Sequence, residues 1–163
     1  MTSSSAAITA AKPKTSPWMA SLYGGLITGI LFAVFTLLLQ TSMPVLWGLC
    51  FLLVGAGPVL GYQLAAGRLG SDWRTIIGGI VGNVIPGLGW VIAWPLLVWL
   101  FHIKANSFLR LWLGSLIGAV LGLAVFFAIG LLMGQDPIWF GPGLSVLWGI
   151  WGGAAAAFQT GRE

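Results

Sequence analysis

Long apolar stretches of this chain contain at most one charged side chain. The run from Trp18 to Gln40 is one of them, and further apolar runs cover 44–66, 109–134 and, more briefly, 143–158. About 20 apolar residues in a helix reach across a hydrocarbon core of about 30 Å. Only 6% of the 163 residues are charged, against about 25% in a soluble domain. The sequence therefore predicts an all-α, polytopic integral membrane protein, in contact with membrane lipids.

The scarce ionisable residues exclude several chemistries. Cys50 is the single cysteine and His102 the single histidine, so a disulfide scaffold, a cysteine zinc site and an iron–sulfur cluster are excluded. The acids Asp72, Asp136 and Glu163 all lie outside the apolar runs. Paired-carboxylate catalysis and a buried proton relay need such groups within the fold. We expect no enzymatic activity, no metal and no catalytic cofactor.

The central stretch, 75–101, decides the number of spans. It is apolar but broken by Asn83, Pro86 and Gly87. If it crosses the membrane once, the chain has five spans and its seven cations are divided between both sides. If it turns at the break and re-enters, the chain has four spans and every cation lies on one side. The tendency of cations to remain cytoplasmic favours the second arrangement, with a cytoplasmic N-terminus.

Two helical hairpins then flank the broken segment, and they resemble each other. The tetrapeptide at 45–48 recurs at 146–149, which indicates either an internal repeat or the chance likeness of apolar sequences. The predicted organisation is a mobile cytoplasmic tail at 1–17, a first hairpin at 18–66, a loop with the central segment at 67–108, a second hairpin at 109–160 and a tail at 161–163.

Glycines recur at four-residue spacing, which is typical of helices that approach closely in lipid. The chain has 25 glycines. They pack the protein's own helices, or one stripe docks a partner subunit or a second copy. The candidate packing or partner positions are Gly25, Gly29, Gly114, Gly118 and Gly122.

Ten tryptophans form a second excess. Some lie near predicted span ends, where aromatic belts are common. Others lie deeper and either fill space beside the glycines or line a groove for a lipid or pigment. The deeper set is Trp47, Trp90, Trp94, Trp99, Trp148 and Trp151.

Asn83, Pro86 and Gly87 are the candidate solute-binding or hinge residues. An amide within a broken apolar stretch either coordinates a substrate or caps the interrupted helix locally. We expect His102, Lys104 and Arg110 to lie at the cytoplasmic interface without a special role. Ser71 or Asp72 is expected to cap the helix that follows.

Small loops, many docking stripes and the lack of a catalytic constellation favour a non-enzymatic accessory, assembly or scaffold subunit of a larger membrane complex. One alternative is a small permease or channel-like protein, as a homo-oligomer, for a neutral or weakly polar solute at 83–89. A second alternative is a pigment- or lipid-binding membrane protein. Because the cations are spread along the chain, we expect no nucleic-acid partner.

Overall fold

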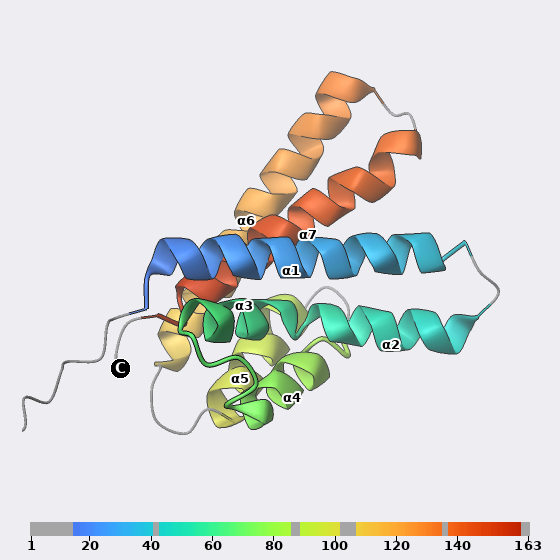
Figure 1. Ribbon diagram of the computed structural model, residues 1–163. Coiled ribbons are helices and arrows are strands. Elements are labelled where there is room, and N and C mark those ends of the chain that lie inside the picture. Colours follow the sequence, from blue (N-terminus) through green and yellow to red (C-terminus); the bar gives the residue numbers. More distant parts are fainter. Residues whose placement is uncertain (1–14, 41–42, 86–88, 102–106, 135–136, 161–163) are drawn as a thin grey trace, which may run out of the picture.

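The computed structural model describes residues 15–40, 43–85, 89–101, 107–134 and 137–160 (Figure 1). Every regular element within these ranges is helical, with no strand, which confirms the all-α prediction. The predicted tails at 1–17 and 161–163 lie outside the described residues, except for the last three residues of the first.

Two helices are long and apolar enough to cross a membrane. They are α1 (Pro17–Leu38) and α6 (Phe108–Met133). The pair α2 (Pro44–Val54) and α3 (Gly57–Ala65) adds a third span if it crosses as one unit, since its members are bent by 42°. Within the described ranges the structure thus supports membrane association, and a count of four or five spans stays a prediction.

The bend between α2 and α3 was not anticipated from the sequence. Pro58 has no backbone N–H, so it cannot continue the hydrogen-bond ladder at this point. The N–H of Gly55 bonds to the carbonyl of Leu52, three residues back, instead of the carbonyl of Phe51. The bend therefore deprives the Phe51 carbonyl of its ordinary helical donor.

The central stretch forms a short antiparallel hairpin. It consists of α4 (Trp73–Gly82), the π-helical turn η1 (Gly89–Ala93) and α5 (Trp94–Phe101). A Cβ placed on Gly78 would lie 3.0 Å from the Leu97 carbonyl oxygen, and one on Gly82 would lie 2.6 Å from Trp94 Cα. These pairings run in opposite directions along the chain. The end of α5 therefore returns to the end at which α4 begins (Figure 1).

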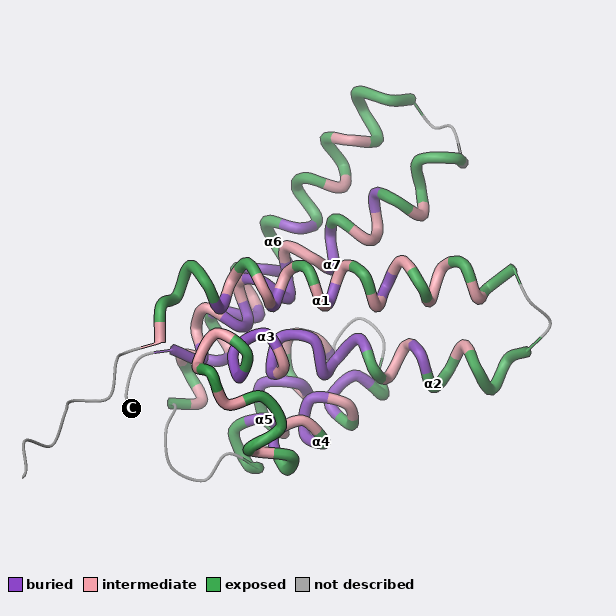
Figure 2. Tube along the Cα trace, viewed as in Figure 1, coloured by how far each residue is buried: buried purple, intermediate pink, exposed green. Residues whose placement is uncertain are grey.

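Helix α7 (Phe140–Ala157), preceded by the 3-10 turn η2 (Pro137–Trp139), packs between α1 and α6. It begins three residues before the predicted start at Gly143. Buried residues gather where α1, α3, α6 and α7 meet, whereas the distal ends of both hairpins are exposed (Figure 2). The core is thus confined to one part of the molecule.

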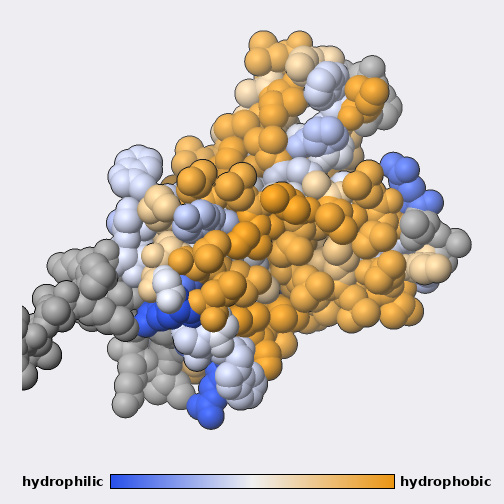
Figure 3. Space-filling view, viewed as in Figure 1, coloured by the Kyte–Doolittle hydropathy of each residue, from blue (hydrophilic) through white to orange (hydrophobic). Residues whose placement is uncertain are grey.

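The surface is strongly apolar. In Figure 3, hydrophobic residues cover most of the visible face along α1 and α2, and hydrophilic residues gather toward the two ends of α1. This distribution matches a molecule whose middle contacts hydrocarbon and whose ends reach the head groups.

Candidate functional site

The two interrupted parts of the chain meet at Asn83. This residue ends α4, is fully buried, and donates a hydrogen bond from Nδ2 to the Phe51 carbonyl oxygen at 2.6 Å. The Trp94 indole Nε1 donates to the Gly55 carbonyl oxygen at 2.8 Å. Both acceptors flank the α2–α3 bend, so the central hairpin supplies donors where that bend interrupts the helical ladder. The sequence left open whether Asn83 coordinates a solute or caps its own helix; in the structure its side-chain amide bonds to a different helix.

Two polar atoms at this junction have no hydrogen-bond partner in the described part of the chain. They are the Asn83 Oδ1 acceptor and the Trp90 Nε1 donor. An unsatisfied buried polar group costs about 1–3 kcal/mol, so native proteins rarely retain one without a reason. One of these atoms is an acceptor and the other a donor.

Four of the six deeper tryptophans pack on one another: Trp90, Trp94, Trp148 and Trp151. Trp99 is instead 40% exposed, and the Trp47 indole bonds to the Leu38 carbonyl. The Trp90 and Trp148 ring centroids are 4.1 Å apart, and the Trp148 and Trp151 centroids 5.3 Å apart. Trp151 Nε1 donates to Ser115 Oγ at 2.9 Å, and that hydroxyl in turn donates to the Trp90 carbonyl oxygen. The cluster is therefore tied together by a polar chain as well as by ring contacts.

The candidate glycines all face α7 of the same chain. Cβ atoms placed on Gly25 and Gly29 would lie 3.0 Å from the Gly149 carbonyl oxygen and 3.3 Å from the Ser145 carbonyl oxygen. On the other side of α7, the matching neighbours are Phe158 for Gly114, Ala154 and Trp151 for Gly118, and Leu147 for Gly122.

Sequence reasoning missed the role of Thr28. It is fully buried and donates a hydrogen bond to the Gly24 carbonyl oxygen at 2.6 Å. Gly57 on α3 and Gly152 on α7 both face this side chain, so α1 approaches two helices at one point. The sequence feature that could have revealed this contact is the presence of Gly57 and Gly152 in two separate apolar runs. The sequence does not, however, indicate which residue these glycines face.

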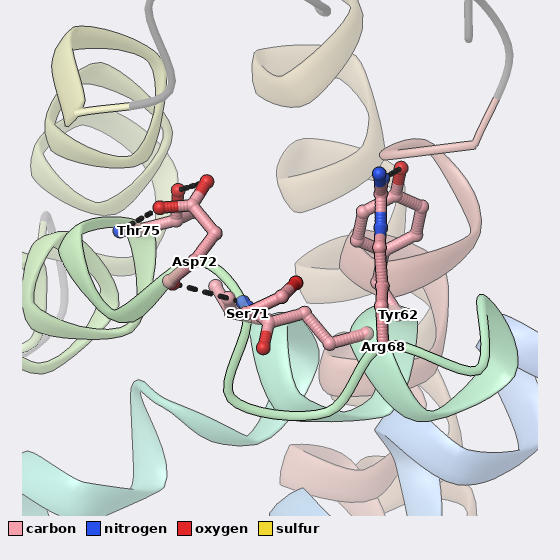
Figure 4. Close-up of a pocket in the computed structure, with 7 residues that line it drawn as sticks. Tyr62, Arg68, Ser71, Asp72 and Thr75 are labelled. Atoms are coloured by element: carbon pink, nitrogen blue, oxygen red, sulfur yellow. Dashed lines mark hydrogen bonds between the residues drawn. The ribbon is translucent and has the colours of Figure 1, made fainter.

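A small cavity of about 220 Å³ lies where α3 ends and α4 begins. Figure 4 shows Asp72 with Thr75 on one side of this space, Arg68 with Tyr62 on the other, and Ser71 between them. Val59 and Gln63 complete the lining. This cavity combines both charge signs with apolar side chains.

Asp72 confirms the predicted cap. Its Oδ1 accepts from the Thr75 backbone N–H at 3.2 Å, at the N-terminus of α4. Arg110 lies half-buried in the first turn of α6. Four other candidates, Pro86, Gly87, His102 and Lys104, lie outside the described residues.

No three His, Cys, Asp or Glu side chains in the described ranges lie close enough together to hold a metal ion. Comparison of the chain with family profiles, curated proteins and solved structures finds no match to any of them. The arrangement of the residues is therefore what carries the functional argument.

Proposed function

We propose that this chain is a non-enzymatic accessory or assembly subunit of a larger membrane complex. The observation that carries the proposal is the outer half of α6, which projects beyond the chain's own core. Up to Gly122 the helix buries one residue on nearly every turn, including Leu111 and Ser115. None of the residues 123–133 is buried.

This outer half is apolar on every side. Leu131 and Leu132 are 87% and 85% exposed, and Phe127 is 64% exposed. Its 11 residues extend about 16 Å at 1.5 Å per residue. A Cβ on Gly130 would meet no atom within 4 Å, so a second helix has room to approach the backbone closely. In lipid, such contacts drive helix association.

We further propose a multi-pass topology with a cytoplasmic N-terminus and four spans around a re-entrant hairpin. The antiparallel pairing of α4 and α5 supports it, because both ends of the hairpin lie at one end of the molecule. That end then carries the cationic segments, as the positive-inside tendency requires. Asn83, at the start of the break, is buried within protein, the environment in which interrupted backbone is tolerated at membrane depth.

Site-specific photo-crosslinking in native membranes tests the proposed subunit role. A photoreactive residue replaces Leu131 on the outer half of α6, and Ile30 on α1 serves as the matched control, since it is also a lipid-accessible apolar side chain. We expect one discrete adduct with a different polypeptide at position 131 and none at position 30. No protein adduct at 131 contradicts the proposal.

A homomeric adduct at 131 would instead support the second candidate, a permease or channel-like homo-oligomer for a neutral polar solute. The unpartnered Asn83 Oδ1 and Trp90 Nε1 favour this alternative, because they leave one buried acceptor before the helix break and one buried donor after it. Flux of small neutral solutes into vesicles containing the purified chain, abolished by Asn83→Ala with folding intact, would establish it. The absorption spectrum of the same preparation tests pigment binding.

A further inference from the structure

The cavity between α3 and α4 is lined by a cation and a carboxylate that face it from opposite sides (Figure 4). Val59 and Tyr62 supply an apolar floor, and both are buried. The cavity volume of about 220 Å³ leaves room for a small polar group.

The carboxylate side of the cavity is held in place. Asp72 Oδ2 accepts from Thr75 Oγ1 at 2.5 Å while Oδ1 accepts from the Thr75 N–H. Gln63 fixes the connecting loop with both ends of its amide, donating to the Asp72 carbonyl at 2.9 Å and accepting from the Gly70 N–H at 2.8 Å. Gly70 has a φ of +76°, a backbone conformation that glycine adopts readily and residues with a side chain rarely adopt.

The cationic side is held as well. The Arg68 guanidinium carbon lies 5.3 Å from the centroid of the Tyr62 ring, and Nη2 donates to the Tyr62 hydroxyl. The Arg68 backbone N–H bonds to the Gln63 carbonyl at 2.9 Å. Because both charges are positioned by the fold, a ligand loses little free energy in ordering them.

The balance of charge selects the ligand class. A simple anion is attracted by Arg68 but repelled by Asp72, whereas a simple cation is attracted by Asp72 but repelled by Arg68. A group with a phosphate and an ammonium a few ångströms apart satisfies both, and Ser71 offers a hydroxyl between them. An ionised carboxylate has about four acceptor sites on its two oxygens, so the bonds to Thr75 do not prevent Asp72 from accepting from an ammonium as well.

We propose that this cavity binds the phosphoethanolamine head group of a membrane phospholipid. The inference rests on the proposed topology, which places the end of α3 and the start of α4 at the cytoplasmic surface, where such head groups lie. Arg68 then contacts the phosphate, Asp72 the ammonium, and Ser71 the phosphate oxygen nearest to it.

Native mass spectrometry of the purified chain tests this site with two probes, phosphatidylethanolamine and phosphatidylglycerol. We expect about tenfold tighter binding of phosphatidylethanolamine, which is the scale of one charge-assisted contact. Competition by free O-phosphoethanolamine supports the same zwitterionic site with a soluble source, and its absence supports a lipid source. Equal binding of the two lipids to the wild-type chain overturns the proposal.

Three variants identify the residues. Asp72→Asn keeps a good capping side chain but removes the charge, so the preference should reverse toward phosphatidylglycerol. Arg68→Gln should lose the binding of both lipids. Arg74→Gln is the matched control, because this exposed arginine on α4 removes the same charge but does not line the cavity. An equal loss in Arg74→Gln would show non-specific attraction and contradict the site.

The lipid-binding measurement and the crosslinking at Leu131 test the two proposals separately, so a negative result in one does not decide the other. Lipid selectivity is read from the purified chain alone, whereas the adduct requires a partner in native membranes. Loss of selectivity with an adduct present rejects only the head-group site. Selectivity without an adduct rejects the subunit role and leaves the head-group site in place.

Discussion

The side-chain amide of Asn83 bonds to the backbone carbonyl of Phe51, with Nδ2 and the carbonyl oxygen 2.6 Å apart. The two residues come from separate interruptions, one at the end of α4 and one before the α2–α3 bend. Each interruption therefore stabilises the other: the bend frees an acceptor and the hairpin brings a donor to it. This relationship makes the break at Asn83 part of the fold as well as a candidate site.

Asn83→Ala should lower the free energy of unfolding by about 1–2 kcal/mol. The variant leaves the Phe51 carbonyl without this donor and opens a small cavity, while removal of the unpartnered Oδ1 offsets part of the loss. Reversible unfolding in mixed micelles measures the change. Val84→Ala, at the exposed neighbouring position, should stay within about 0.5 kcal/mol. Equal stability of the wild type and Asn83→Ala would show that the bond contributes nothing.

The close approach of α1 to α7 predicts a contrast between two glycines. A Cβ on Gly24 would lie 2.8 Å from the Gly152 carbonyl oxygen and closer still to the Ala156 side chain, so Gly24→Ala should cost about 1–3 kcal/mol through overpacking. A Cβ on Gly48 meets nothing within 4 Å. Gly48→Ala should therefore be neutral or stabilise α2 by about 0.5–1 kcal/mol. Thermal midpoints in detergent compare the pair, and similar losses in both variants would contradict close packing at Gly24.

The polar chain within the tryptophan cluster predicts that Ser115 is costly to replace. Ser115→Ala leaves the buried Trp151 indole N–H and the Trp90 carbonyl without this partner, at a cost of about 1–3 kcal/mol in unfolding free energy. Ser145→Ala is the matched control, since in the described part of the chain its hydroxyl bonds to the Gly141 carbonyl of its own helix, at 3.0 Å. A loss in Ser145→Ala as large as that in Ser115→Ala would mean that the hydroxyls act through helix propensity alone.

The sequence predicted the helical class and the central break because apolar runs and prolines act locally. The cap at Asp72 was predicted for the same reason, since it depends on residues within one turn. The partner of Asn83 could not be predicted. Its acceptor lies 32 residues away and lacks a helical donor because the Gly55 N–H, at the bend in another helix, bonds to the Leu52 carbonyl instead.

The cavity at Arg68 and Asp72 was also beyond sequence reasoning. Its two charged residues lie four positions apart in the sequence. The space between them depends on the loop conformation, which the Gln63 amide fixes through hydrogen bonds to the backbone of Gly70 and Asp72. Similarly, glycine spacing predicted close packing of helices, but spacing alone does not say which helix each stripe faces. Helix α7 receives both stripes because α1 and α6 lie on different sides of it.

The return of the central hairpin predicts which loops share a side of the membrane. Single cysteines are introduced at exposed positions in a Cys50→Ala background, which removes the one native thiol. An impermeant thiol reagent should label Ser71→Cys and Ser107→Cys from the same side, because these positions flank the hairpin formed by α4 and α5. Met43→Cys and Gly134→Cys, at the distal ends of the two outer hairpins, should be labelled from the opposite side. Labelling of positions 71 and 107 from opposite sides would mean that residues 75–101 cross the membrane, giving five spans and rejecting the re-entrant topology.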